Sequence, residues 1–221
     1  MISIFNVTGP VMIGPSSSHT AGAARLARVA RNIAGSDFVH VSFGLHGSFY
    51  YTYRGHGTDK ALLAGALGLA EHDEGIRNAE KLAQQLGITY DYYRADIELD
   101  HIHENSVEVQ FHRACGEIVS VVGSSVGGGQ ILIRRIGQLE VEFCANLPTL
   151  VIEHLDRPGM LSKFTQIIGD YGINVAVMRL TRNKKGGRAC SIIESDNKIP
   201  ASIIEKITSI GDVFNALVLH V

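Results

Sequence analysis

Apolar and polar positions in the first two thirds of the chain follow a helical period at first and an extended period later. Leu26, Val29 and Ile33 share one stripe at helical spacing, which indicates an amphipathic helix. Helices are predicted in this part over residues 21–34, 60–70 and 73–86. Strands are predicted over residues 2–7, 38–46, 107–111, 131–133 and 139–143, the last three within a stretch of period two that runs from 88 to 143. This order predicts a mixed α/β domain.

Two details of these helices can be stated from residue preferences. Thr58 or Asp59 is the natural N-cap of the helix predicted over 60–70, because a side-chain oxygen there accepts from a free backbone N–H. In the helix predicted over 73–86, one apolar stripe is expected to face the core; it consists of Ile76, Ala79, Leu82, Ala83 and Leu86.

The pattern restarts at about Pro148. Strands are predicted over residues 149–154, 173–181, 188–194 and 213–220, and helices over 159–170 and 200–209. Gly172 is expected to end the first of these helices in a left-handed conformation. The order βαββαβ is that of the split-βαβ, ferredoxin-like arrangement. The chain is therefore expected to be an α+β protein with one domain over residues 1–145 and a second over 148–221.

Composition excludes several classes of protein. The formal net charge is −2 and the sequence pI is about 6.5, so electrostatics predict no nucleic-acid partner and no anionic membrane partner. No apolar run reaches the roughly 20 residues of a membrane helix, and the N-terminus lacks a signal-peptide pattern. Cys115, Cys144 and Cys190 are widely spaced and odd in number, which fits neither a disulfide framework nor a C-x-x-C metal site. A cytoplasmic protein is expected.

The most distinctive local pattern is Gly-Pro-Ser-Ser-Ser-His-Thr at residues 14–20, directly before a predicted helix. We call these residues the first loop. Free N–H groups at a helix start attract anions, and neighbouring hydroxyls add donors, so the first loop could hold a carboxylate or a phosphate. His19 could exchange a proton nearby. Simple capping by one of the hydroxyls explains the same residues equally well.

Residues 55–59, Gly-His-Gly-Thr-Asp, repeat this design and are called the second loop. A histidine in a glycine-rich loop is more often structural than catalytic. Two such loops in one domain nevertheless favour a common pocket for His19 and His56.

Two other patterns give weaker predictions. Gly127, Gly128 and Gly129 lack the spacing of a phosphate-binding P-loop, and a tight connection between strands explains them better. His101 and His103 could bind a metal ion from one strand face, but a solvated loop is the better interpretation because no further ligands follow at suitable spacing.

In the second domain, Asp-Arg-Pro-Gly-x-Leu at residues 156–161 places a strand end, a turn and a helix start together. A bound amino acid could rest its carboxylate on that helix start. Asn174, at the start of the next strand, is expected to face the same edge. A plain turn with proline at an early helix position is the alternative.

These residues resemble known families. The segment from Pro148 to Val221, with Asp-Arg-Pro-Gly-x-Leu and Tyr-Gly-Ile-Asn-Val, resembles an ACT domain. The resemblance implies pairing of such domains and an amino-acid effector, for which the expected contacts are Asp156, Pro158, Gly159, Leu161 and Asn174.

The N-terminal part resembles the beta chain of bacterial iron–sulfur L-serine dehydratases. The motifs that carry this likeness are the two loops, His-Gly-Ser-Phe and Ser-Val-Gly-Gly-Gly. This part is also similar to the allosteric substrate-binding domain of some phosphoglycerate dehydrogenases. The resemblance implies a lyase that converts L-serine to pyruvate and ammonia, in which a [4Fe–4S] cluster acts as the Lewis acid.

The cysteines of this chain do not match the ligand pattern of that family, which belongs to the alpha chain. An alpha subunit is therefore expected to hold the cluster, no metal is expected in this chain, and the isolated chain is expected to be inactive. L-serine is the expected substrate and a possible effector, and at least a homodimer, through the ACT or the N-terminal domain, is expected. The residues expected near the substrate are Ser16, Ser17, Ser18, His19, Thr20, His56, Thr58 and Asp59.

Two alternatives remain open at this point. The chain could be a stand-alone amino-acid-binding regulatory module without a catalytic contribution, since both loop types suit that role. It could also be a hydrolase that uses Ser17 or Ser18 with His19, although the motif lacks the nucleophile-elbow signature.

Overall fold

The computed structural model describes residues 16–220, so the strand predicted over 2–7 lies outside the described range. The chain divides into two compact units, residues 1–137 and 138–221. This division precedes strand β6 (Leu139–Phe143), whereas the boundary expected from the sequence follows it. The reason is that β6 packs against two strands of the second unit. Among the described residues, no helix is long and apolar enough to span a membrane.

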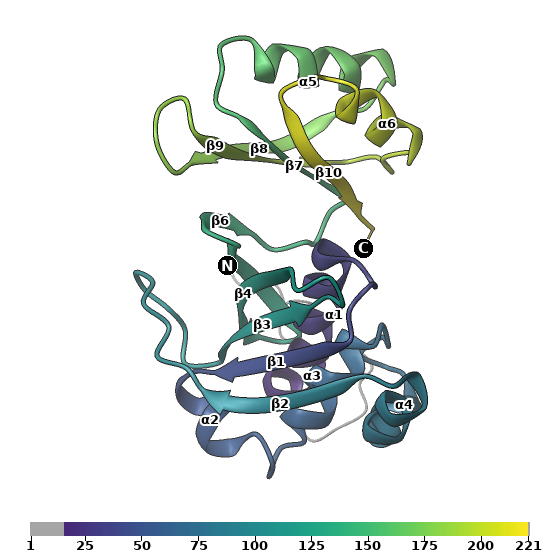
Figure 1. Cartoon of the computed structure of the whole chain (residues 1–221), viewed down its shortest axis with the longest axis vertical. Coiled ribbons are helices and arrows are strands. Elements are labelled where there is room, and N and C mark those ends of the chain that lie inside the picture. The colour runs from purple at the N-terminus through teal and green to yellow at the C-terminus, as the bar shows by residue number, and fades with distance from the viewer. Residues whose placement is uncertain (1–15, 221) are drawn as a thin grey trace. The chain divides into compact units, whose positions relative to one another are not determined.

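The first unit is built on a mostly antiparallel sheet (Figure 1). The strands that belong to the first unit have the order β2-β1-β3-β4-β5 in this sheet. Their bounds are β1 (His40–Leu45), β2 (Thr89–Arg94), β3 (Ser106–His112), β4 (Ile118–Gly127) and β5 (Gln130–Ile136). In these five strands, β1 and β2 pair in parallel, and the other neighbouring pairs are antiparallel. Phe43 lies opposite Val109, and this register places the large apolar side chains of β1 and β3 on one face.

Helices cover that apolar face. Their bounds are α1 (Ala23–Ala34), α2 (Gly47–Thr52), α3 (Thr58–Ala66) and α4 (Ala79–Leu86), with a π-helical turn at Ser17–Gly22 and a 3₁₀ turn at Glu74–Asn78. Helix α1 packs on β4 and on α3, and Leu26 and Leu62 are fully buried. The two helices approach closely because Gly65 has no Cβ; a Cβ there would collide with the carbonyl of Ala24. This close contact fixes the two loops that precede α1 and α3.

The structure corrects three details of these helices. The helix predicted from residue 21 starts regularly only at Ala23, because the preceding residues form the π-helical turn. Neither Thr58 nor Asp59 is the N-cap of α3; that position belongs to Gly57, whose φ of 70° is left-handed. Leu86, expected in the core, is 56% exposed, because α4 ends there and its last turn leaves the packed surface. In addition, α2 was not predicted.

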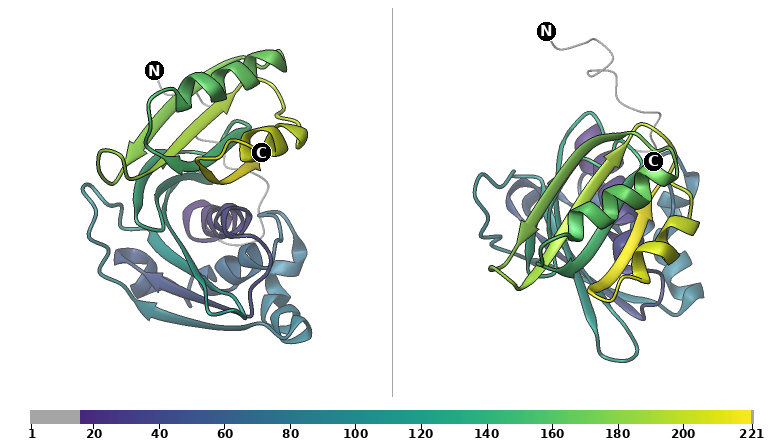
Figure 2. Two further views of the ribbon diagram at one scale, coloured as in Figure 1. Left: turned by 45° about the horizontal axis from the view of Figure 1, so that its top comes forward. Right: turned by 90° about the horizontal axis from the view of Figure 1, so that it is seen from above.

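The second unit has the predicted order of elements. After β6 follow β7 (Thr149–Leu155), α5 (Met160–Asp170), β8 (Val175–Arg182), β9 (Arg188–Ser195), α6 (Ser202–Thr208) and β10 (Val213–Leu219). The sheet order is β10-β7-β9-β8, and all its pairs are antiparallel. Both helices lie over one face of this sheet (Figure 2). Gly172 follows α5 with a φ of 66°, as predicted.

Between the helices and the sheet lies a single apolar core of the second unit. Phe164 of α5, Ile203 of α6 and Leu150 of β7 are fully buried in it. The apolar stripes of two short helices thus meet one face of four strands, and burial of each large side chain contributes roughly 1.5–3 kcal/mol. The ferredoxin-like arrangement predicted from the order of elements is confirmed.

Candidate functional site

The described part of the first loop, residues 16–20, caps and begins the π-helical turn and points His19 toward the second loop. Ser16 caps this turn, since its Oγ accepts from the backbone N–H of His19 at 3.1 Å. The same Oγ lies 3.5 Å from His19 Nδ1. The capping interpretation therefore applies to Ser16, while the imidazole of His19 stays available for other contacts.

The second loop lies beside the first. The rings of His19 and His56 have centroids 4.8 Å apart, and Thr20 Oγ1 donates to the carbonyl oxygen of His56 at 3.2 Å. The convergence predicted for the two loops is therefore found. Helices α1 and α3 produce it, because each loop leads directly into one of two helices that pack together.

Two polar atoms near this histidine pair are buried and have no hydrogen-bond partner among the described residues. They are His56 Nδ1 and Thr58 Oγ1, and Thr58 is 0% exposed. An unpaired buried polar group costs roughly 1–3 kcal/mol. Such a cost is typical of a site whose partner is a ligand or another chain.

Two serines outside the predicted set complete the surroundings of the first loop. Ser48, in α2, places its Oγ 3.3 Å from His19 Nε2. Ser125, in β4, donates to the carbonyl oxygen of Ser18 at 2.9 Å. The sequence did hold signals for both, because they belong to or adjoin the His-Gly-Ser-Phe and Ser-Val-Gly-Gly-Gly motifs.

Electrostatics favour the neutral form of His19. Burial, and to a smaller extent the neighbouring His56, lowers the pKa of His19 below its usual range. A neutral imidazole whose nitrogens face Ser16 and Ser48 can take a proton from a bound molecule or return one.

Asp59 contacts other groups than the histidines. Its carboxylate accepts from the backbone N–H of Lys60, and its carbonyl oxygen accepts from the hydroxyl of Tyr92. Burial raises the pKa of this carboxyl above its usual range. The structure thus separates Asp59 from the pair that the first and second loops form.

The serines of the first loop have different surroundings. Among residues 16–220, the hydrogen bonds of the His19 ring come from Ser16 and Ser48, and none comes from Ser17 or Ser18. A serine nucleophile needs a hydrogen bond to its base. The hydrolase interpretation therefore gains no support from this geometry.

The weaker patterns have the structural roles that were preferred for them. Gly127, Gly128 and Gly129 form the turn between β4 and β5, and all three have positive φ. His103 lies in a loop, where its Nδ1 accepts from the backbone N–H of Asn105.

The residues that the structure describes do not form a site for an iron–sulfur cluster. They include no group of three or more His, Cys, Asp or Glu side chains that could hold a metal ion. Cys115 is exposed in the β3–β4 connection, whereas Cys190 is buried in β9, where burial raises its thiol pKa to about 12. A cluster ligand must be a thiolate, so Cys190 is unsuited to that role.

In the second unit the predicted effector residues separate into two places. Asp156 accepts from the backbone N–H of Gly186 and from Arg182, and these two contacts lower the pKa of its carboxyl. Gly159 precedes α5 in a left-handed conformation with a φ of 84°. These residues and Leu161, which is partly exposed, surround the turn between β7 and α5.

Asn174 lies elsewhere. It precedes β8, while Arg182, the contact of Asp156, is the last residue of that eight-residue strand. At ~3.3 Å per residue the two ends are roughly 25 Å apart. Within one chain Asn174 therefore does not share the edge of the β7–α5 turn, and the side chain donates instead to Asp196 at 2.6 Å. The prediction that it would face this turn was wrong, because β8 runs its full length between them.

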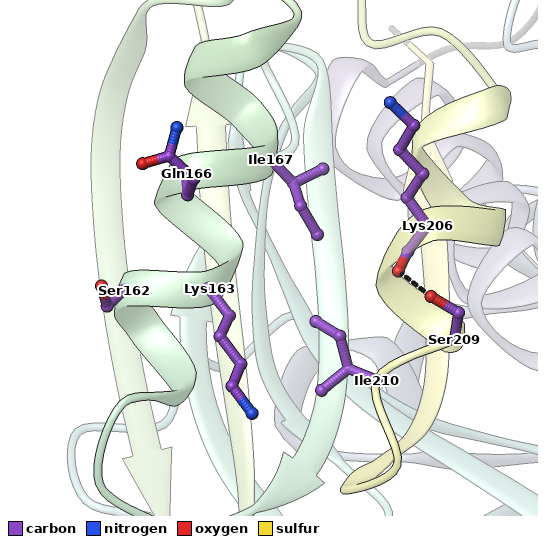
Figure 3. A pocket seen from close by; sticks show the side chains of 7 residues that line it. All are labelled: Ser162, Lys163, Gln166, Ile167, Lys206, Ser209 and Ile210. Atoms are coloured by element: carbon purple, nitrogen blue, oxygen red, sulfur yellow. Dashed lines mark hydrogen bonds between the residues drawn. The ribbon is translucent and has the colours of Figure 1, made fainter.

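A groove also lies between α5 and α6, with a volume of about 560 Å³ (Figure 3). Its apolar part consists of Ile167 and Ile210, and Lys163 and Lys206 stand on opposite helices. The Lys206 ammonium lies over the ring of Tyr171 at 4.6 Å. None of the predicted effector residues lines this groove.

Comparison with known proteins identifies the family. The model of the serine dehydratase beta chain matches residues 3–135, and that of the ACT domain matches residues 149–212. The chain is 37% identical over 201 residues to the L-serine dehydratase beta chain of Peptoniphilus asaccharolyticus, covering 91% of this chain and 90% of the relative. It is 35% identical over 211 residues to a probable L-serine dehydratase beta chain of Bacillus subtilis, covering 96% and 94%.

A more distant likeness is to D-3-phosphoglycerate dehydrogenase of Methanocaldococcus jannaschii, at 32% identity over 46% of this chain and 19% of the relative. The serine dehydratase match spans both loops of the histidine pair, and the ACT match lies within the second unit. The chain therefore belongs to the serine dehydratase beta chain family and carries an ACT domain.

Proposed function

We propose that this chain is the beta subunit of an L-serine dehydratase, and that it deaminates L-serine to pyruvate and ammonia together with a cluster-bearing alpha subunit. The observation that carries the proposal is the pair His19 and His56, formed by two family motifs and accompanied by unpaired polar atoms. The names of its relatives as beta chains support the partnership.

Serine loses its α-proton and its β-hydroxyl in this reaction. The resulting enamine tautomerises to an imine, and water then releases pyruvate and ammonia. The alpha subunit would supply the [4Fe–4S] cluster, because the described residues of this chain do not fit it.

The residues of this chain would bind the zwitterion and move a proton. Hydroxyls and backbone N–H groups of the first loop would hold the carboxylate of serine. His19, neutral at pH 7, would accept or return a proton at the substrate, and Thr58 Oγ1 and His56 Nδ1 would gain the partners that they lack. Ser17, Ser18 and Thr20 shape the first loop in this proposal.

Anaerobic co-expression with the alpha chain tests the proposal. The purified pair should form pyruvate from L-serine, whereas this chain alone should form none. If the cluster-loaded pair binds serine but releases no pyruvate or ammonia, the proposed reaction is wrong.

The second unit would bind an amino-acid effector between two copies. Strand β8 is an outer strand of its sheet and can pair with the same strand of a second copy. Antiparallel pairing across a two-fold axis would bring Asn174 of one copy toward the β7–α5 turn of the other. Ultracentrifugation at micromolar concentration should therefore show a dimer, and a strictly monomeric mass would contradict this arrangement.

A regulatory module without a catalytic contribution is the second candidate, which the ACT domain favours. Calorimetry with L-serine separates the two candidates when it is combined with the activity assay. If serine binds, but the alpha subunit has the same activity with and without this chain, the module is correct and the proposed subunit role is not.

A further inference from the structure

The first unit carries a patch of aromatic side chains next to the histidine pair. We call it the tyrosine patch, and it consists of Tyr50, Tyr51, Tyr53, Tyr90 and Tyr92 with Arg54 and Arg94. The chain has seven tyrosines, so five of them gather at one place. The proposed reaction does not account for this concentration, and the packing of the core accounts only for the innermost ring, Tyr92, which stacks on Phe43.

The patch is continuous and rests on the core. Tyr53 contacts Tyr92 with ring centroids 5.7 Å apart, and Tyr92 stacks on the buried ring of Phe43 at 5.1 Å. Tyr50 links Tyr53 to Tyr51 through centroid distances of 6.5 Å and 5.6 Å. Rings held in this way lose little conformational entropy when another protein covers them.

The outer end of the patch is exposed although it is aromatic. Tyr51 is 72% exposed, the highest value among the exposed large apolar and aromatic side chains of the described residues. Buried tyrosines and arginines carry much of the binding energy of protein interfaces. An exposed tyrosine such as Tyr51, surrounded by further aromatic rings, is typical of a surface that another protein covers.

The charges of the patch indicate what that protein presents. The guanidinium of Arg54 lies 5.5 Å from the ring centre of Tyr53, and that of Arg94 lies 6.0 Å from the ring centre of Tyr50. Within residues 16–220, Arg54 has no carboxylate at ion-pair distance, and Arg94 forms only an exposed pair with Asp96 at 3.6 Å. A surface with carboxylates would complement this charge.

The patch is connected to the candidate site on two sides. Helix α2 carries Tyr50 and Tyr51 together with Ser48, whose hydroxyl lies beside His19. The hydroxyl of Tyr92 donates to the carbonyl oxygen of Asp59 in the second loop. A protein that reaches the histidine pair with its own catalytic groups would therefore have the patch beside its point of approach.

We infer that the tyrosine patch is the docking surface for the partner subunit, which covers Tyr51 and places carboxylates opposite Arg54 and Arg94. This inference rests on the proposed function, because only a cluster-bearing partner needs to reach the histidine pair. The interface thus aligns the two halves of one active site.

Binding of the full chain to a tagged alpha subunit, measured anaerobically by interferometry, tests this inference. Tyr51→Ala should weaken binding about 10- to 30-fold, and Arg54→Glu at least as much. The matched controls come from the second unit, where Arg188 lies over the partly exposed ring of Phe214 at 4.6 Å. Phe214→Ala and Arg188→Glu should bind within about twofold of the unsubstituted chain.

All four variants should unfold at the temperature of the parent chain, because their side chains are exposed or lie on the surface. Equal binding by patch variants and parent overturns the inference, and so does failure of the parent chain to bind the alpha subunit. A third outcome also overturns the inference: the patch variants no longer self-associate but still bind the alpha subunit. The patch would then join two copies of this chain. If the parent pair binds but forms no pyruvate, the proposed function fails while the docking surface stands.

Discussion

The two units place their candidate binding groups in opposite ways. In the first unit, Ser48 and His56 come from distant parts of the sequence and meet His19 and its neighbour Ser16 within one chain. In the second unit, Asp156 and Asn174 lie only 18 residues apart in sequence, yet an entire strand separates them in space. The first site is assembled by helix packing, whereas the proposed effector site would need another copy of the chain to bring these two residues together.

The contrast shows what each unit can do alone. A proton-transfer group requires fixed neighbours, and the packing of α1 against α3 provides them. An effector site between copies can instead couple binding to assembly. The following predictions test this difference, from the largest expected effect to the smallest.

The largest effect is expected from His19→Ala in the reconstituted complex. Loss of a positioned acid–base group should lower kcat by roughly 10²- to 10⁴-fold. Steady-state assays of pyruvate formation measure this change. As the counterpart in the second unit, Asn174→Ala should leave kcat without effector within about twofold, and comparable losses in both variants would remove the distinction between the two sites.

The stability effects of alanine substitutions at two helix glycines, one in each unit, compare how tightly the helices pack. Gly65→Ala in α3 should destabilise the chain by about 1–3 kcal/mol, because the new Cβ meets the carbonyl of Ala24. Gly169→Ala in α5 has open space around the new Cβ and should stabilise by about 0.5–1 kcal/mol. Urea unfolding measures both changes, and a Gly65→Ala variant as stable as the parent chain would show that the close helix contact is absent.

Ser48→Ala tests how far a neighbour of His19 contributes. The hydroxyl faces Nε2 and helps to hold the ring, so its removal should cost about tenfold in kcat with KM nearly unchanged, equivalent to ~1.4 kcal/mol. Ser48→Thr, which keeps a hydroxyl, should restore most of the activity. A variant Ser48→Ala with parental kcat would make this contact incidental.

The smallest effect concerns protonation. The pKa of His19 should lie below the usual histidine value, so the ring stays neutral at pH 7. The loss of kcat/KM at acid pH should therefore begin below the usual histidine pKa. Because the folded chain binds this proton less readily than the unfolded chain, stability should rise with pH through the window between the two pKa values.

Burial is the larger cause of the low His19 pKa and the neighbouring His56 is the smaller one. His56→Asn removes the smaller cause and should therefore move the pKa of His19 upward. NMR titration of the His19 ring in the isolated chain measures it. A downward shift would contradict the sign.

Local sequence patterns predicted most features that depend on contacts between residues close in the sequence. The βαββαβ order of the second unit, the left-handed Gly172 and the turn at Gly127–Gly129 were all predicted from period, capping and glycine preferences. The N-cap of α3 was not, because Gly57 supplies a left-handed approach that outweighs the usual preference for Thr or Asp.

The candidate site could be predicted only in part. Sequence singled out His19 and His56, since both lie in loops before helices. It marked Ser48 only as part of the His-Gly-Ser-Phe motif, without placing it beside His19, and it gave no reason to separate Asp59 from the histidines. Those outcomes depend on how α2 and α3 lie against the first loop, and that arrangement comes from burial spread over many residues.

The amino-acid sequence by itself determined most of the elements, the family and the two histidine-bearing loops, because periodicity, capping and motif spacing act within a few residues. Tertiary structure alone decided which side chains of the two loops meet, that Asn174 lies an entire strand from the β7–α5 turn, and that five tyrosines form one surface. Packing of helices and pairing of strands join residues far apart in the chain, and no local preference encodes such distances.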